Sequence, residues 1–115
     1  MSSSNPVTPF KAKKRKPDPV CFTRPEFEQI LSLYGFFVAA GDWRDYAVDM
    51  LPERAVFSVF RRASEAPLYR IEKQPKLARK QGQFAVVHAS GQTLKRGQDL
   101  TMVLNVFNRQ KLKLT

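Results

Sequence analysis

The chain has 115 residues, 43% of them hydrophobic and 26% charged, and its 20 Lys and Arg outnumber its 10 Asp and Glu. This length and composition predict one globular domain. A single Cys excludes an intrachain disulfide. One Cys and one His supply too few ligands for a zinc site, so we expect no metal and no cofactor. No apolar run reaches the ~20 residues that span a bilayer and no secretion signal is present, which predicts a cytoplasmic protein outside the membrane.

The first part of the chain is rich in serine, proline and basic residues. Residues 1–22 contain four prolines and the run KAKKRK, which predicts a disordered basic arm in front of a domain over residues 23–115. The basic residues of this arm are candidates for phosphate contacts that do not read sequence: Lys13, Lys14, Arg15 and Lys16. In a eukaryotic protein the same run would resemble a nuclear localisation signal.

An amphipathic helix is predicted to follow the arm. The segment Thr23-Arg24-Pro25-Glu26 is a capping box, and apolar residues then recur at spacings of three and four up to about Ala40. Gly41 can take the left-handed conformation that ends a helix. The main apolar stripe consists of Phe27, Ile30, Leu31, Tyr34 and Val38. It is widened by Leu33, Phe36 and Phe37. We expect this stripe to face the core; the alternative is that the latter three residues form an exposed patch that binds a second copy or another protein.

From Trp43 the apolar period changes to two, which predicts strands at 43–50, 55–61, 68–73, 84–89 and 92–95. Short connections indicate antiparallel pairing, with one helical turn in the loop 74–83 and a two-residue turn at Ser90-Gly91. A last helix should start at Gln98 or Asp99 and end near Asn108, and residues 111–115 should form an edge strand or a basic tail. The predicted fold is therefore α+β: an antiparallel sheet of four to five strands with an amino-terminal amphipathic helix and a carboxy-terminal helix.

Few residues are suited to catalysis. His88 lies in mid-strand and Cys21 lies beside the arm without a nearby histidine, so neither is expected to act as a base or a nucleophile. A group of carboxylates is expected to be a solvated polar face rather than a cation site: Asp42, Asp45, Asp49 and Glu53. The glycines match neither a P-loop nor a dinucleotide fingerprint. We therefore expect no enzymatic activity.

Positive charge is concentrated in the second half of the chain, because residues 66–115 carry ten Lys and Arg and only two acidic residues. The candidate phosphate contacts here are Arg70, Lys73, Lys76, Arg79, Lys80, Lys95 and Arg96. Two of these basic pairs lie close to Gly82 and Gly97, whose backbone amides can add contacts to a phosphate. Tyr69 and Phe84 flank the group and would stack on bases if exposed, but the alternation of their strands favours the core.

Several runs resemble a family of short bacterial proteins catalogued only as a domain of unknown function: AAGDWRDYAVDML (39–51), AVFSVFRRASEAPLYRIEK (55–73), PKLARKQG (75–82) and LKRG (94–97). The resemblance covers residues 22–114 and leaves out the arm. It implies a bacterial cytoplasmic protein, which removes the nuclear interpretation of the basic run, and it brings no known activity or ligand. The expected function is non-catalytic binding of RNA or DNA backbone, or of another polyanion, in a ribosome-associated or regulatory role. The alternative is a protein-interaction or homodimeric module.

Overall fold

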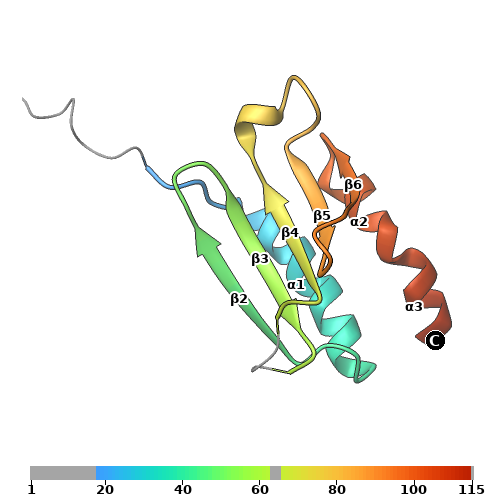
Figure 1. Cartoon of the computed structure of the whole chain (residues 1–115). Coiled ribbons are helices and arrows are strands. Elements are labelled where there is room, and N and C mark those ends of the chain that lie inside the picture. The colour runs from blue at the N-terminus through green and yellow to red at the C-terminus, as the bar shows by residue number, and fades with distance from the viewer. Residues whose placement is uncertain (1–17, 63–65, 115) are drawn as a thin grey trace, which may run out of the picture.

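The computed structural model describes residues 18–62 and 66–114. Helix α1 (Arg24–Ala39) comes first, and five strands follow it: β2 (Asp45–Met50), β3 (Ala55–Phe60), β4 (Tyr69–Lys73), β5 (Phe84–His88) and β6 (Thr93–Gly97). The last described elements are α2 (Leu100–Leu104), the 3-10 turn η4 (Asn105–Phe107) and α3 (Asn108–Leu114). The strands pair antiparallel in sequence order, which confirms the predicted α+β fold (Figure 1).

The bounds of α1 follow from residues at its two ends. The Thr23 hydroxyl accepts from the Glu26 amide at 3.3 Å, and the Glu26 carboxylate accepts from the Thr23 amide at 2.8 Å, so the predicted capping box is confirmed. After the helix, Gly41 has a φ of +82°, a conformation that glycine adopts without a steric penalty. The buried residues of the helix are Ile30, Leu33 and Phe37.

The pairing register gives the sheet two different faces. Phe57 and Ile71 lie opposite each other on β3 and β4 and belong to the core between the sheet and α1. Their neighbours Val56 and Glu72 form the equivalent pair on the other face, because side chains alternate along a strand. Figure 1 shows α1 crossing behind the sheet, and within the described chain no helix covers the face turned to the viewer.

Aromatic residues fill the core at the end of the sheet where α1 finishes. Trp43 stacks on Phe37 with ring centroids 4.4 Å apart, and Phe107 contacts these two rings at 5.4 and 5.9 Å. All three residues are at most 1% exposed. Because Trp43 precedes β2 and Phe107 belongs to η4, this cluster joins the early and late parts of the domain.

The hairpin between β5 and β6 differs from the predicted two-residue turn. The His88 amide donates to the Gln92 carbonyl at 2.8 Å, so the loop consists of the three residues between them. Gly91 has a φ of +94° and its amide donates to the His88 carbonyl, which is the usual geometry of a three-residue hairpin loop. The extra loop residue shifts β6 to Thr93–Gly97, later than the predicted 92–95.

The carboxy-terminal segment is helical, so the predicted edge strand or basic tail over 111–115 is wrong. Asp99 caps α2 by accepting from the Thr101 amide at 2.9 Å, and the chain continues helically through η4 into α3 as far as Leu114. Five alternating residues are too few to distinguish a strand from a helix. Lys111 and Lys113 in the last turn also suit the negative end of the helix dipole.

Contacts of the domain begin before the predicted boundary at Thr23. The Val20 amide donates to the Leu51 carbonyl at 2.9 Å, and Phe22 packs against the core. The end of the predicted arm is thus held at the turn that links β2 to β3. Its other residues, 1–17, among them Lys13 to Lys16, lie outside the described residues.

Candidate nucleic-acid interface

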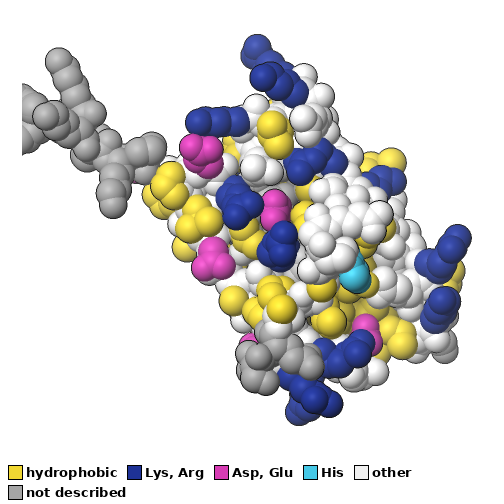
Figure 2. Space-filling model, viewed as in Figure 1, with side chains coloured by type: hydrophobic (Ala, Val, Ile, Leu, Met, Phe, Trp, Pro, Cys, Tyr) yellow, Lys and Arg dark blue, Asp and Glu magenta, His cyan; other side chains and the backbone are white. Residues whose placement is uncertain are grey.

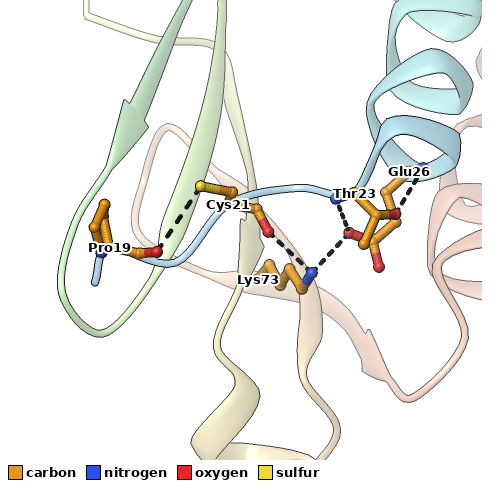
Figure 3. A network of polar contacts seen from close by, with 5 residues as sticks. All are labelled: Pro19, Cys21, Thr23, Glu26 and Lys73. Atoms are coloured by element: carbon orange, nitrogen blue, oxygen red, sulfur yellow. Dashed lines mark hydrogen bonds and ion pairs between the residues drawn. The ribbon is translucent and has the colours of Figure 1, made fainter. Parts of the chain in front are cut away.

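Lys73 is buried rather than exposed. Its ammonium donates to the Cys21 carbonyl at 3.0 Å and to the Glu26 carboxylate at 2.8 Å, and its side chain is 11% exposed (Figure 3). The same Glu26 oxygen accepts from the Thr23 amide, so this oxygen joins β4 to the start of α1. Lys73 is therefore used inside the fold, which corrects its place among the predicted phosphate contacts.

Arg70 lies on the uncovered face of the sheet and is paired there with a buried carboxylate. Its Nε lies 3.2 Å from Glu72 Oε2, and the Nη1 of Arg54 lies 3.7 Å from Glu72 Oε1. Glu72 is only 5% exposed, whereas the arginine side chains keep 34% and 45% of their surface exposed. One carboxylate thus neutralises part of the charge of two guanidinium groups, and the sequence analysis did not single out Arg54.

The loop 74–83 packs closely against the end of β6. Gly82 has a φ of +105°, and a Cβ atom there would lie 2.5 Å from the carbonyl carbon of Gly97. Only glycine fits this contact. Arg96 Nη1 donates to the Gly82 carbonyl at 3.2 Å, and the Gln98 side chain donates to the Ala78 carbonyl. These contacts bring the Arg79-Lys80 segment and the Lys95-Arg96 segment to the same end of the sheet.

We call this group the basic corner; it consists of Lys76, Arg79, Lys80, Lys95 and Arg96. Arg79, Lys80 and Lys95 are exposed, and none of the three has an ion-pair partner among the described residues. Lys76 lies 3.9 Å from Glu53 in a pair whose side chains are both more than 70% exposed, a geometry that contributes little energy. Figure 2 shows dark blue side chains over this end of the sheet.

The amino-terminal segment enters the domain at the same end. Strand pairing places Met50 opposite Ala55, Ala55 opposite Lys73, and Lys73 opposite Phe84, so the turn after β2 and the loop after β4 lie at one end of the sheet. The hydrogen bond from Val20 to the turn after β2 therefore lies at the end of the sheet that carries the basic corner. The predicted contacts Lys13 to Lys16 precede this residue in the sequence and are not described.

A family model described as a protein of unknown function (DUF2794) matches residues 20–104. The chain belongs to this family. No curated protein and no solved structure matches it. The resemblance found in the sequence is thus confirmed, although the match ends at the last residue of α2 rather than at residue 114. The DUF2794 match includes the whole sheet and the basic corner, and it begins at Val20, where the contacts of the domain begin.

The structure confirms the expected core position of Leu33 and Phe37 and contradicts the alternative of an exposed apolar patch on α1. Leu33 is 8% exposed and Phe37 is completely buried, because both lie on the helix face that carries Ile30. Phe36 is half-buried, and the ammonium of Lys111 lies 5.2 Å from the centre of its ring. Val38, which the pattern placed on the buried stripe, is 40% exposed. The buried stripe of α1 is therefore rotated from the predicted one, and Leu33 and Phe37 cannot bind a partner.

The remaining candidates for chemistry do not converge. Asp42 pairs with Arg61 at 3.5 Å and Asp45 accepts from the Tyr46 amide, and the described residues contain no group of three or more His, Cys, Asp or Glu that could hold a metal ion. The His88 Nδ1 accepts from the Ser90 amide at 3.1 Å, which stabilises the hairpin loop. No helix in residues 18–62 or 66–114 has the length and hydropathy needed to span a membrane.

Two aromatic residues considered for base stacking are not available for it. Phe84 is 4% exposed and belongs to the core. Tyr69 packs edge-on against Phe107 and its hydroxyl accepts from Gln110 at 3.1 Å. The candidate interface of this DUF2794 protein therefore depends on cations and not on aromatic stacking.

The sequence contains a signal for the burial of Lys73, because strand alternation places this residue on the same face as Tyr69 and Ile71.

Proposed function

We propose that this protein is a non-catalytic, cytoplasmic nucleic-acid-binding protein that contacts the phosphate backbone through its basic corner. The observation that carries the proposal is the close contact between Gly82 and Gly97. This contact holds together two basic segments that are separated in sequence, and the result is a local excess of unpaired positive charge. Such an excess raises both the affinity and the association rate for a polyanion.

The position of these cations favours backbone contacts over base recognition. Arg79 and Lys80 lie in a loop, and Lys95 and Arg96 lie on the edge strand β6. Lys95 and Arg96 are consecutive strand residues, so their side chains leave opposite faces and the corner wraps around the edge of the sheet. In this arrangement the corner can follow a phosphate backbone, whereas reading base edges requires an element that enters a groove.

The test is the salt dependence of binding to a labelled DNA duplex by the full chain. Replacing Arg79, Lys80 and Lys95 together by Gln should reduce the slope of log Kobs against log salt by about 2.7, since each lost phosphate contact contributes about 0.9. A matched control replaces Arg44, Arg62 and Lys113 by Gln. All three are exposed, and they lie in the segments before β2, after β3 and in α3, away from the basic corner.

The two triple variants have the same net charge, so a difference between them reports position and not total charge. An equal loss of slope in both variants, or no measurable binding by the unmodified chain, would refute the proposal. A separate variant with Gln at the basic residues of the arm, Lys13 to Lys16, measures the contribution of that segment. The proposal requires that the corner variant loses binding even when the arm is unchanged.

A further inference from the structure

Among the described residues, β2 is an edge strand and its outer side is unpaired. The Leu51 amide donates to the Arg54 carbonyl at 2.8 Å, and hydrogen-bonded and non-bonded pairs alternate along an antiparallel ladder. The N–H and C=O groups of Tyr46, Val48 and Met50 therefore point away from β3. In the described part of the chain no other segment pairs with these groups: the contact from Val20 reaches only Leu51, and the Tyr46 amide donates to the side chain of its neighbour Asp45 at 2.8 Å.

An apolar groove runs beside this edge on the helix-covered side of the sheet. Its volume is about 520 Å³, and it is lined by Phe22, Arg24, Phe27, Val48 and Met50. Met50 is 54% exposed, and Tyr46 on the same face of the strand is 39% exposed. Because the side chains of Val48 and Met50 line the groove while their backbone groups point outward, an added strand would place its own alternate side chains into the groove.

The other face of β2 carries negative charge. Asp45 and Asp49 are exposed, and neither has an ion-pair partner within the described residues. Both project from the sheet face opposite the groove, because they alternate with Tyr46, Val48 and Met50. Figure 2 shows hydrophobic and acidic side chains side by side along this margin of the sheet. The edge therefore presents apolar contacts on one face and carboxylates on the other.

We propose that the β2 edge binds an extended peptide segment of a partner protein in which Lys or Arg alternates with apolar side chains. The apolar side chains of this segment fill the groove, its cations face Asp45 and Asp49, and its backbone completes the ladder at the Tyr46 carbonyl and at the N–H and C=O groups of Val48 and Met50. Opposite charges on adjacent strands stabilise pairing, and like charges weaken it. A second copy of β2 would bring its own two carboxylates to the same face, so charge favours a basic partner over self-association.

This inference does not depend on the proposed nucleic-acid binding, because β2 and β6 are opposite edges of the sheet. The test uses the full chain and a labelled synthetic peptide of four Lys-Val repeats, with binding measured by fluorescence anisotropy. A peptide of four Glu-Val repeats keeps the apolar pattern and reverses the charge. A Lys-Val peptide with N-methylated valines keeps charge and side chains but removes backbone donors, so we expect both control peptides to bind at least about tenfold more weakly.

Variants of the protein locate the site. Replacing Asp45 and Asp49 by Asn should weaken binding of the Lys-Val peptide about fivefold at low salt, since two cross-strand charge pairs are lost. The control, Asp42→Asn with Glu53→Gln, removes the same charge outside β2 at residues whose ion-pair partners do not line the groove, and it should leave the affinity unchanged. Equal binding of the Lys-Val and Glu-Val peptides, or an unchanged affinity for the N-methylated peptide, would overturn the proposal.

Two further outcomes would assign the edge to another occupant and also overturn the proposal. One is a dimer of the protein alone in sedimentation equilibrium that the Lys-Val peptide dissociates, which would identify a second copy. The other is a tenfold rise in peptide affinity when Lys11 and Lys13 are replaced by Gln in the full chain. That rise would mean that the chain's own basic segment competes for the edge.

Discussion

The charges on β4 and the charges at the margins of the sheet differ in what the fold does with them. On β4, Lys73 and Glu72 are almost completely buried, and each has an oppositely charged group within 3.2 Å. The margins carry charges that are exposed and have no ion-pair partner in the described chain: Lys80 in the loop 74–83, Lys95 on β6 and Asp49 on β2.

The difference follows from the position of β4 in the sheet. It has a neighbouring strand on each side, so a charge there loses most of its water and must be paired. The loop 74–83 and the edge strands keep their water, so their charges need no partner inside the protein. Charge density along the sequence is therefore a poor guide to binding, and the margins carry the charges that remain free for other molecules.

The largest effect should come from removing a charge on β4. Lys73→Met keeps the apolar stem and removes the ammonium, which leaves the Glu26 carboxylate with the Thr23 amide but without its cation and removes the donor to the Cys21 carbonyl. We expect the free energy of unfolding in urea to fall by about 3 kcal/mol, the low end of the range for breaking a buried pair. The matched change at the margin, Lys80→Met, should alter it by less than about 0.5 kcal/mol. Equal changes in the free energy of unfolding of the two variants would show that charges on β4 and charges at the margins contribute equally to stability.

Glu72→Gln should separate stability from binding. The change leaves Arg54 and Arg70 without their carboxylate, and the free energy of unfolding should fall by about 1 to 2 kcal/mol. The two guanidinium groups become free cations on the uncovered face, so the salt slope of DNA binding should steepen by up to about 1.8, at about 0.9 for each new phosphate contact. Replacing Arg79, Lys80 and Lys95 by Gln should have a different effect: DNA binding should weaken, and the free energy of unfolding should stay unchanged. A Glu72→Gln variant that loses both properties would contradict this separation.

Local signals in the sequence were sufficient for most of the fold. The capping box at Thr23 and the glycine at 41 define α1, and the change to a period of two from Trp43 predicts the first strand to within two residues of its observed start at Asp45. These predictions succeeded because they depend on residues within a few positions of one another. The prediction for residues 111–115 was wrong because five residues cover little more than one helical turn, which is too short to distinguish a period of two from a period of 3.6.

The candidate site could be predicted only in part, because its geometry depends on contacts between distant segments. Nothing near Lys73 in the sequence shows that Glu26 and Cys21 will surround its ammonium. Likewise, Gly82 and Gly97 were noted as neighbours of basic residues, but their contact with each other depends on the pairing of β5 with β6. The sequence shows how many charges there are, whereas the pairing of strands decides which of them are free.

The smallest predicted effect tests the acidic margin on β2. Burial raises the pKa of Tyr34 above its usual value of about 10, and the charge of Asp45 and the neighbouring Tyr46 raise it further. The unfolded chain therefore loses this proton at a lower pH than the folded protein, so stability falls as the pH rises from about 10 towards the folded pKa.

Tyr34→Phe should show a smaller loss of stability between pH 9 and pH 11. Asp45→Asn should lower the pKa of Tyr34 in an absorbance titration, because the nearby negative charge is gone. If the titration is the same in both proteins, the charge of Asp45 does not contribute to the raised pKa of Tyr34, and burial and the neighbouring Tyr46 account for it.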